Sequence, residues 1–177
     1  DLLDASKIDL GMLKITKTDI NLTDIIREVV NDIRRKPYYS TKNNSSTKTK
    51  PNIKLNLPSH PIIVRGDKFR ITQVLFNLLD NAIKFTNSGL ILVSIKLDVK
   101  NLVRVSIKDD GKGIDSRIQS KLFEKFTTMS DTGIGLGLFI SKKIIDSHGG
   151  TISGKNNKDA RGATFSFTLP SITAKNN

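Results

Sequence analysis

The stretch DTGIGLGLFISKKIID, residues 131–146, decides how the rest of this sequence is interpreted. Its three glycines, Gly133, Gly135 and Gly137, alternate with apolar residues and run directly into a helical pattern. A glycine inside a helix costs about 1 kcal/mol relative to alanine, so three at a helix start need a reason. Free backbone N–H groups at a helix N-terminus, together with the helix dipole, favour an anion such as phosphate. The stretch therefore predicts a phosphate site, with a tight helix-packing turn as the alternative.

The spacing of these glycines matches neither of two common nucleotide motifs. No Lys-Ser or Lys-Thr pair follows Gly137, which excludes the GxxxxGK[ST] phosphate loop. The spacing also differs from the dinucleotide GxGxxG motif, and no strand leads directly into the glycines.

A second polar feature lies on the strongest predicted helix, residues 67–86. Asn77, Asn81 and Lys84 stand at i, i+4 and i+7, so they share one face. An amide oxygen suits Mg²⁺, and a lysine is a point charge for phosphate. The alternative is an ordinary polar face. The apolar face of the same helix is expected to consist of Ile71, Val74, Leu75, Leu78, Leu79 and Ala82.

A third feature is the stretch IKDDGKGID, residues 107–115, where a predicted strand delivers Asp109 and then breaks at Gly111 and Gly113. Glycine allows close approach of the backbone to a ligand. A carboxylate at a strand end can accept a hydrogen bond from an exocyclic amine. A plain Asp-Gly turn is the alternative.

The remaining periodicity predicts an α/β two-layer sandwich, a mixed β-sheet with three helices on one face. Asn21 or Thr23 is expected to cap the helix over 21–36. Residues 37–51 are expected to form a flexible loop. Helices are predicted over 1–10, 21–36, 67–86, 116–126 and 136–150, and strands over 13–20, 52–57, 62–66, 90–99, 102–109, 151–157 and 163–170.

Composition limits the classes of function. A chain of 177 residues fits one domain, and the absence of cysteine excludes disulfides and cysteine-ligated metals. No apolar run is long enough to span a bilayer. A net charge of +12 permits binding to nucleic acid or another anion, but the lysines are spread along the chain with no nucleic-acid motif. Because the chain starts at Asp1 and not Met, we expect a fragment of a longer protein.

Together, these motifs resemble those of one family, the sensor histidine kinases. The resemblance covers about residues 19–170 and implies the GHKL, or Bergerat, ATP-binding fold. The segments that resemble the N box, the two glycine boxes, the phenylalanine box and the closing strand are NLLDNAIKFT, DDGKGI, GIGLGLFISKKIIDSHGG, LFEKF and GATFSFTLP.

The resemblance implies ATP as ligand and Mg²⁺ as cofactor. Asp109 should accept from the adenine amino group, supported by Thr164. Asn81 should bind Mg²⁺ with Asn77 near the metal, and Lys84 should contact phosphate; Asn77 and Lys84 are the expected catalytic residues. The residues assigned to ATP are Asn77, Asn81, Lys84, Phe85, Asp109, Gly111, Gly113, Ile114, Phe123, Phe126, Thr132, Gly133, Gly135, Leu136, Gly137, Leu138 and Thr164.

The implied reaction is transfer of the γ-phosphoryl group of MgATP to a histidine, for relay to a response regulator. Asn77 stands where gyrase-like ATPases carry a glutamate, and an amide is no general base, so transfer is favoured over hydrolysis. The resemblance implies an ATP lid over TTMSDT, residues 127–132, which is short for the family and carries no lysine or arginine. Lys125 is the nearest cation. His60 and His148 are expected to be structural, and a protonated His148 would suit a helix C-terminus.

The resemblance also implies an organisation and partners. Residues 1–14 resemble the end of the second dimerisation helix, 15–172 form the catalytic domain, and 173–177 form a disordered tail. The expected partners are the phosphoacceptor helices and a receiver domain, with a homodimeric parent, a monomeric fragment, no nucleic acid and a cytoplasmic location. The alternatives are a hydrolysing GHKL ATPase, for which Asp80 is a poor substitute base, and a non-catalytic nucleotide- or nucleic-acid-binding module.

Overall fold

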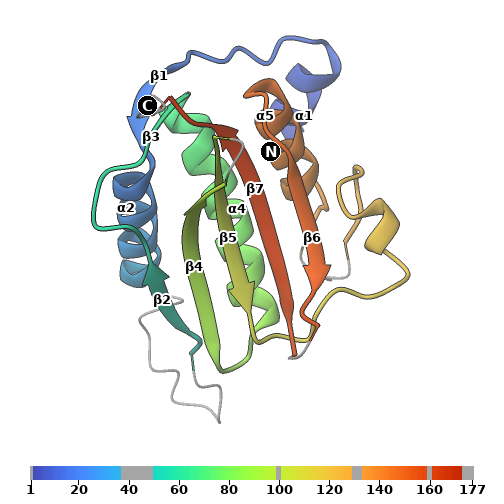
Figure 1. Cartoon of the computed structure of the whole chain (residues 1–177). Helices are drawn as coiled ribbons and strands as arrows, with labels where there is room; N and C mark the ends of the chain where they lie inside the picture. Colours follow the sequence, from blue (N-terminus) through green and yellow to red (C-terminus); the bar gives the residue numbers. More distant parts are fainter. Residues whose placement is uncertain (1, 37–49, 99–100, 129–132, 159–160, 173–177) are drawn as a thin grey trace.

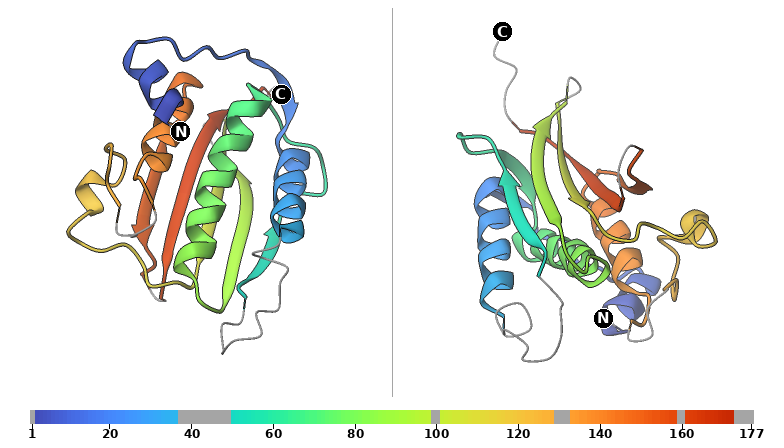
Figure 2. Two further views of the ribbon diagram at one scale, coloured as in Figure 1. Left: turned by 180° about the vertical axis from the view of Figure 1, so that it is seen from behind. Right: turned by 90° about the horizontal axis from the view of Figure 1, so that it is seen from below.

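The computed structural model describes residues 2–36, 50–98, 101–128, 133–158 and 161–172. A five-stranded mixed sheet forms one layer, and three helices, α2, α4 and α5, cover one of its faces (Figures 1 and 2). The helices are α1 (Leu2–Asp9), α2 (Leu22–Arg35), α4 (Lys68–Phe85), the short 3₁₀ helix η1 (Gln119–Lys121) and α5 (Gly137–Ser147). The strands are β1 (Thr18–Asn21), β2 (Asn52–Asn56), β3 (Ile63–Gly66), β4 (Leu90–Leu97), β5 (Leu102–Asp109), β6 (Ile152–Asn156) and β7 (Ala163–Pro170).

The large sheet has the order β2-β4-β5-β7-β6. β2 pairs with β4 in parallel, and the other neighbours are antiparallel, so the sheet is mixed as predicted. In the central strand β5, Ile107 pairs with Val93 on one side and Phe165 on the other. Two residues later β5 ends at Asp109, so the sheet delivers this carboxylate at the edge of the core.

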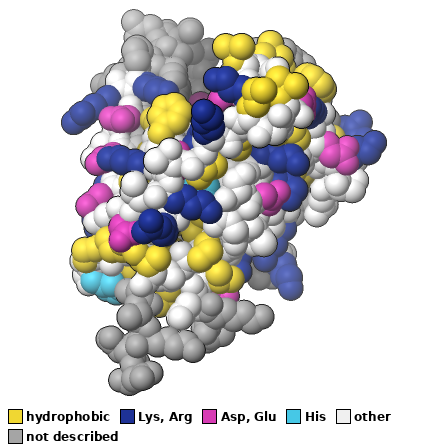
Figure 3. Space-filling model, turned by 90° about the horizontal axis from the view of Figure 1, so that it is seen from above, with side chains coloured by type: hydrophobic (Ala, Val, Ile, Leu, Met, Phe, Trp, Pro, Cys, Tyr) yellow, Lys and Arg dark blue, Asp and Glu magenta, His cyan; other side chains and the backbone are white. Residues whose placement is uncertain are grey.

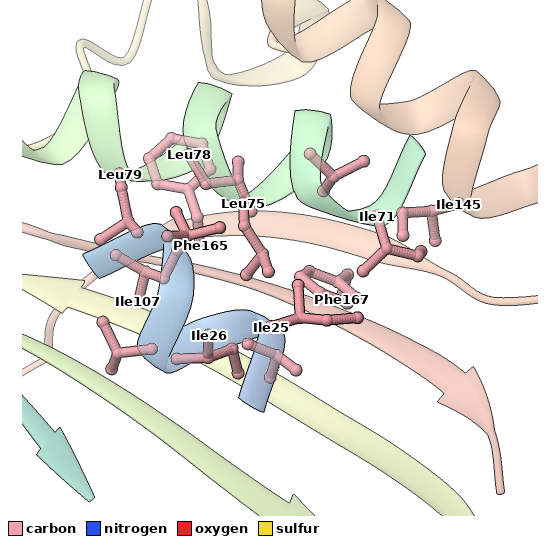
Figure 4. Packing of buried hydrophobic residues seen from close by; sticks show 14 of the residues in the cluster. Ile25, Ile26, Ile71, Leu75, Leu78, Leu79, Ile107, Ile145, Phe165 and Phe167 are labelled. Carbon is pink, nitrogen blue, oxygen red and sulfur yellow. The ribbon is translucent and has the colours of Figure 1, made fainter. Parts of the chain in front are cut away.

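The core lies between the sheet and α4, whose predicted apolar face is buried as a whole. Asp67 caps the helix, its carboxylate accepting from the backbone N–H of Arg70 at 3.1 Å. Leu75 of α4 lies near Phe167 of β7, and Ile26 of α2 completes the cluster (Figure 4). Burying a side chain of this size contributes about 1.5–3 kcal/mol, so this face positions α4 on the sheet. The polar face of α4 is thereby directed away from the core.

The segment before α2 differs from the prediction of a strand over 13–20. The strand β1 begins only at Thr18 and pairs with β3 in a separate two-stranded antiparallel sheet. Since β3 offers only four residues, from Ile63 to Gly66, the residues before Thr18 have no ladder partner within the part of the chain that the structure describes. Of the two predicted caps of α2, Asn21 is the one observed, and it accepts from the N–H of Thr23 at 3.2 Å.

The predicted helix over 116–126 is also wrong, because only η1 forms there. Leu122 is buried and Ile118 packs against the core. The apolar residues whose spacing suggested a helix therefore pack on the core from a segment of turns. Phe126 has a φ of +60°, a left-handed conformation that no helix continues through. The predicted loop 37–51, apart from its last two residues, and the tail 173–177 lie outside the described residues.

Candidate functional site

A cavity of about 490 Å³ opens beside α4, α5 and the end of β5. Its lining comes from the three sequence features singled out above, which lie far apart along the chain. The residues assigned to ATP that line this cavity are Asn77, Asn81, Lys84, Phe85, Asp109, Gly113, Ile114, Gly133, Gly135, Leu136, Gly137 and Leu138. The fold therefore brings three features to one place. They are the polar face of α4, the aspartate turn (residues 109–114) and the glycine-rich start of α5 (residues 133–138).

Asp109 is the buried carboxylate of the site, with 4% of its surface exposed. One carboxylate oxygen accepts from the N–H of Gly111 at 2.8 Å and from the N–H of Ala163 at 3.3 Å. Burial raises the pKa of Asp109, and neighbouring Asp110 adds to this rise, while the two N–H donors oppose it. A carboxylate held in a nearly dry wall is a strong acceptor for an amino group of a ligand.

Asn77 joins α4 to the start of α5. Its side-chain nitrogen Nδ2 donates to the carbonyl of Gly137 at 3.2 Å and to Oγ of Ser141 at 3.3 Å. A metal contact by Asn77 therefore falls to Oδ1. Asn81, one turn later, is half-buried, and Lys84 is exposed at the rim.

The oxygen atoms of the lining determine which metal ion the cavity could hold. Among the described residues, no group of three or more histidine, aspartate or glutamate side chains could hold a metal ion. Besides the carboxylate of Asp80, α4 brings the amide oxygens of Asn77 and Asn81 to the cavity lining. Hard neutral oxygens of this kind fit a Mg²⁺ ion that arrives with phosphate oxygens and keeps part of its water.

The start of α5 forms one part of the cavity lining. Its N-cap, Leu136, makes no side-chain capping hydrogen bond, and the first backbone bond of the helix runs from Ile140 N–H to the Leu136 carbonyl at 2.9 Å. Gly137 and Leu138 of the first turn line the cavity, next to Gly135 and Leu136. An uncapped helix N-terminus of this kind suits an anion.

Four residues assigned to ATP do not line the cavity. Gly111 lies behind Asp109, where a Cβ would stand 2.7 Å from the carboxylate oxygen. Phe123 is half-buried against the core, and Phe126 is exposed where the backbone turns left-handed. The fourth is Thr164, described next, and Thr132 lies outside the described residues.

Thr164 was expected to support Asp109, but the strand register places it on the opposite face of β7 from Ala163 and Phe165, which line the cavity. The N–H that reaches Asp109 belongs to Ala163, one residue earlier. The Thr164 hydroxyl donates instead to Oδ1 of Asn157 at 2.7 Å.

Three charged residues of the lining were missed from the sequence. Asp80, expected to lie off the polar face, does line the cavity. Lys112 also lines it, and its ammonium lies 4.8 Å from the centre of the Phe85 ring. Asp115 completes the set, with its pKa lowered to about 2 by hydrogen bonds from Arg117. The position of Lys112 between two glycines of the aspartate turn was a signal that could have identified it.

The two remaining questions from the sequence concern His148 and Lys125. His148 is buried, its Nδ1–H donates to the Ile144 carbonyl at 2.7 Å, and its Nε2 accepts from the Asp67 N–H at 3.0 Å. Burial lowers the pKa of His148, which disfavours the protonated imidazole, and its two hydrogen bonds fit the expected structural role. Lys125 pairs with Asp9 of α1, and its ammonium lies 5.0 Å from the ring centre of Phe139.

Comparison with known proteins places these features in a family. The sequence profile of the histidine kinase-, DNA gyrase B- and HSP90-like ATPases matches residues 66–173. The chain belongs to this family, and its relatives are sensor histidine kinases whose ATP-binding catalytic domain it matches. Among the described residues, no helix combines the length and apolar character needed to cross a membrane.

Individual relatives support this family membership. Hybrid signal transduction histidine kinase B of Dictyostelium discoideum is 36% identical over 96% of this chain, which spans 9% of that protein. The solved catalytic domain of histidine kinase ThkA, in a nucleotide-free form, is 34% identical with a TM-score of 0.73, covering 88% of this chain and 96% of that one. Full-length ShkA in complex with AMPPNP has the same fold, at 24% identity and a TM-score of 0.80, over 98% of this chain and 35% of that chain.

Proposed function

We propose that this domain binds MgATP in the described cavity and donates the γ-phosphoryl group to a histidine on a dimerisation domain, for relay to a response regulator. One observation carries the proposal: a single cavity is lined by the buried Asp109, by the row Asn77, Asn81 and Lys84, and by the uncapped start of α5. These are an acceptor for an amino group, ligands for a hydrated cation, and donors for phosphate.

Each residue has a defined task in this proposal. Asp109 accepts from the adenine amino group, and the N–H groups at Gly135 and Gly137 donate to phosphate oxygens. Asn81 and Oδ1 of Asn77 offer oxygens to Mg²⁺, which neutralises phosphate charge when bound. The ammonium of Lys84 supplies positive charge at the rim. The protein thus contributes positioning and charge stabilisation, which are the main requirements of phosphoryl transfer.

The organisation of the parent protein belongs to the same proposal. We assign residues 1–14 to the end of a dimerisation helix, 15–172 to the catalytic domain, and 173–177 to a tail, with the domain in the cytoplasm and the parent a homodimer. α1 is consistent with this assignment because its Leu2 and Leu3, and Leu10 just after it, are exposed apolar side chains, while Ala5 is buried. Asp4 of α1 bonds Arg70 at 3.0 Å, so the helix stays attached to the catalytic domain.

The primary experiment is a calorimetric titration of the chain with a non-hydrolysable ATP analogue, with and without Mg²⁺. Binding that strengthens with Mg²⁺, followed by transfer of labelled phosphate from ATP to a supplied dimerisation domain, supports the proposal. An absence of nucleotide binding by the parent chain would overturn it. Binding without transfer to any supplied phosphoacceptor helix would favour a nucleotide-binding module.

Hydrolysis of ATP is a second candidate, favoured by the presence of the Asp80 carboxylate in the cavity lining. An aspartate can act as general base toward water, which the amide of Asn77 cannot. If Asp80 does so, the chain alone releases phosphate from ATP, and Asp80→Asn abolishes the release while leaving nucleotide affinity unchanged. If phosphate release by the parent chain stays at the buffer rate, the kinase proposal stands without this addition.

The nucleic-acid alternative has less support. On the face viewed in Figure 3, lysine and arginine side chains are scattered among acidic and apolar side chains and do not form one continuous stripe. Elsewhere in the described chain, cations are paired with carboxylates, as in Lys68 with Glu28 and Arg65 with Asp19. A nucleic-acid interface generally gathers its positive charge on one face.

A further inference from the structure

Two neighbouring asparagines at the end of β6 hold the aspartate turn from outside the cavity. The side chain of Asn157 donates through Nδ2 to the carbonyl of Asp109 at 2.9 Å. The side chain of Asn156 bonds both backbone groups of Ile114, accepting from its N–H at 2.6 Å and donating to its carbonyl at 2.9 Å. One dipeptide therefore holds both ends of the segment that runs from Asp109 to Ile114.

The bond between Asn156 and Ile114 depends on a close approach at Gly113. Gly113 has a φ of +79°, and a Cβ there would stand 2.8 Å from Oδ1 of Asn156. Glycine is required at this position both for the backbone conformation and for the room that the amide occupies. The two-point contact with Ile114 resembles one rung of a β-ladder made by a side chain, so it fixes the direction of the backbone as well as its position.

Asn157 is itself held in one orientation. Its Oδ1 accepts from the Thr164 hydroxyl at 2.7 Å, and its Nδ2 also donates to the Arg161 carbonyl at 2.9 Å. Its backbone N–H donates to the Gly162 carbonyl at 3.0 Å. These partners all belong to β7 or to the segment that leads into it. The hairpin formed by β6 and β7 therefore fixes Asn157 before any ligand is present.

The contact with Asp109 acts on the residue whose carboxylate lies in the cavity. Asn157 bonds the main-chain carbonyl of Asp109, while Gly111 and Ala163 hold its carboxylate. Gly162 packs against the same carbonyl, since a Cβ there would stand 2.0 Å from that oxygen. The main chain of Asp109 is thus immobilised behind the cavity, and its free carboxylate oxygen has one direction in which to accept.

We infer that Asn156 and Asn157 are positioning residues that orient the Asp109 carboxylate, and thereby select a purine that carries an amino group at carbon 6. This inference rests on the proposed function, because the amino group is that of adenine. A hydrogen bond to a charged acceptor depends steeply on geometry, so a small rotation of the carboxylate removes selectivity before it removes binding.

The test compares two ligands on the whole chain, ATP and purine riboside triphosphate, which lacks the 6-amino group. Affinities are measured by calorimetry for the parent chain and for Asn157→Ala, Asn156→Ala and Thr164→Val. We expect Asn157→Ala to lower the preference for ATP by about tenfold, the equivalent of one good hydrogen bond. Asn156→Ala and Thr164→Val are expected to lower it by a smaller factor, because each acts on Asp109 through another residue.

The matched control is Ser153→Ala, on the same strand β6. Ser153 bonds Ser166 through their hydroxyls at 3.2 Å, a contact that leads to no residue of the aspartate turn. The control is expected to keep the parent's ratio of affinities. Thermal unfolding of each variant shows whether the fold persists. If Asn157→Ala does not fold, the isosteric variant Thr164→Val provides the test of the affinity ratio in its place.

The outcomes separate this inference from the proposed function. If the parent chain binds neither ligand, the proposed function fails. If the parent prefers ATP, and Asn157→Ala weakens both ligands equally, the asparagines serve stability alone and the inference is overturned. The positioning role is supported if the preference for ATP falls most in Asn157→Ala, less in Asn156→Ala and Thr164→Val, and not at all in Ser153→Ala.

Discussion

The side-chain nitrogen of Asn77 on α4 lies 3.2 Å from the main-chain carbonyl of Gly137 at the start of α5. This contact joins two motifs separated by about sixty residues of sequence, and it also includes the Ser141 hydroxyl at 3.3 Å. A Cβ on Gly137 would stand 3.5 Å from the Asn77 amide carbon, an ordinary contact distance, so the two helices meet without strain. The residue proposed to lie beside the metal therefore also holds α4 to the start of α5.

The first prediction follows from this contact. Replacing Asn77 with alanine removes two hydrogen bonds between helices and leaves the Gly137 carbonyl and the Ser141 hydroxyl without this donor. We expect the nucleotide-free domain to lose about 1–2 kcal/mol in free energy of unfolding, measured by urea denaturation. Lys84→Ala, on the same face but exposed, is the control, and its change should stay within about 0.5 kcal/mol. Equal losses for the two variants would contradict the joining role of Asn77.

The second prediction concerns Asp109. Because burial raises its pKa, the ionised carboxylate is less favourable in the fold than in water, so its contribution to stability is lost as pH rises through the folded pKa. At pH 7 we expect Asp109→Asn to leave the free energy of unfolding unchanged or to raise it by up to about 1 kcal/mol. In the asparagine variant, Oδ1 still accepts from the N–H groups of Gly111 and Ala163. The side-chain nitrogen then faces the ligand and presents a donor where the amino group needs an acceptor, so ATP affinity should fall by about a hundredfold.

The control for this prediction is Asp110→Asn. Asp110 is exposed and accepts from the N–H of Leu90 at 2.9 Å, outside the cavity lining. It carries the same charge one residue away, so it tests whether charge alone matters. An ATP affinity that falls equally in both variants would show that the net charge of this turn, and not the buried acceptor, determines binding.

The third prediction compares two glycines with similar backbone conformations. Gly135 has a φ of +74°, and a Cβ there would stand 2.6 Å from the carbonyl carbon of Phe126 and 2.8 Å from the nitrogen of Thr127. Gly11 has a φ of +66°, with nothing within 4 Å of its Cβ position. Both alanine variants should pay the left-handed conformational cost of about 1–2 kcal/mol. Only Gly135→Ala should also lower ATP affinity, by about tenfold or more, since the cavity wall must shift.

Calorimetric titration and urea denaturation of the two variants together test this prediction. A Gly11→Ala chain that binds ATP as weakly as Gly135→Ala would mean that the effect is one of stability. A Gly135→Ala chain with unchanged affinity would show that the wall of the cavity adapts to the added methyl group.

The fourth prediction is a pH dependence of stability. The pKa of His148 is lowered by burial, so the unfolded chain binds a proton that the folded chain does not hold between the folded pKa and the unfolded value near 6.5. The stability is fully present above that unfolded value and is lost as the pH falls through the folded pKa. Urea denaturation at pH 7.5 and pH 5.5 should show this loss in the parent chain and a smaller loss in His148→Gln.

An NMR titration of the His148 ring provides an independent measurement, with the signal assigned by its absence in His148→Gln. The midpoint should lie below the ordinary histidine value, since Nε2 is occupied as an acceptor by the Asp67 N–H. A midpoint above 6.5 would contradict the neutral, buried imidazole described here.

Much of the fold was predictable because its signals are local. The apolar face of α4, the hairpin of β4 and β5, and the ends of α2 and α5 all depend on residues within a few positions of one another. The two errors have a common origin, because both segments have plausible local patterns. Within the described chain, residues 13–17 have no partner strand. Residues 116–126 form only the short helix η1. Local spacing cannot reveal the absence of a partner.

The site was predictable to a similar extent. Residue type and spacing marked Asn81, Asp109 and the glycines before α5 as candidates, the family resemblance assigned them to ATP, and all of them line the cavity. Thr164 was misplaced by one residue, and a shift of one position in a strand moves a side chain to the other face of the sheet. The strand register decides this, and it is a property of the whole sheet.

The sequence by itself determined which residue types are candidates for nucleotide contact: a carboxylate, two amides, a lysine and a glycine-rich helix start. Only the tertiary structure decided that Asn77 bonds α5, that Asp80 reaches the cavity, and that Asn156 and Asn157 hold the turn of Asp109. The reason is physical: a side chain's chemistry and helical face are local properties. Its hydrogen-bond partner across forty or more residues exists only once the sheet register and the helix packing have brought the two together.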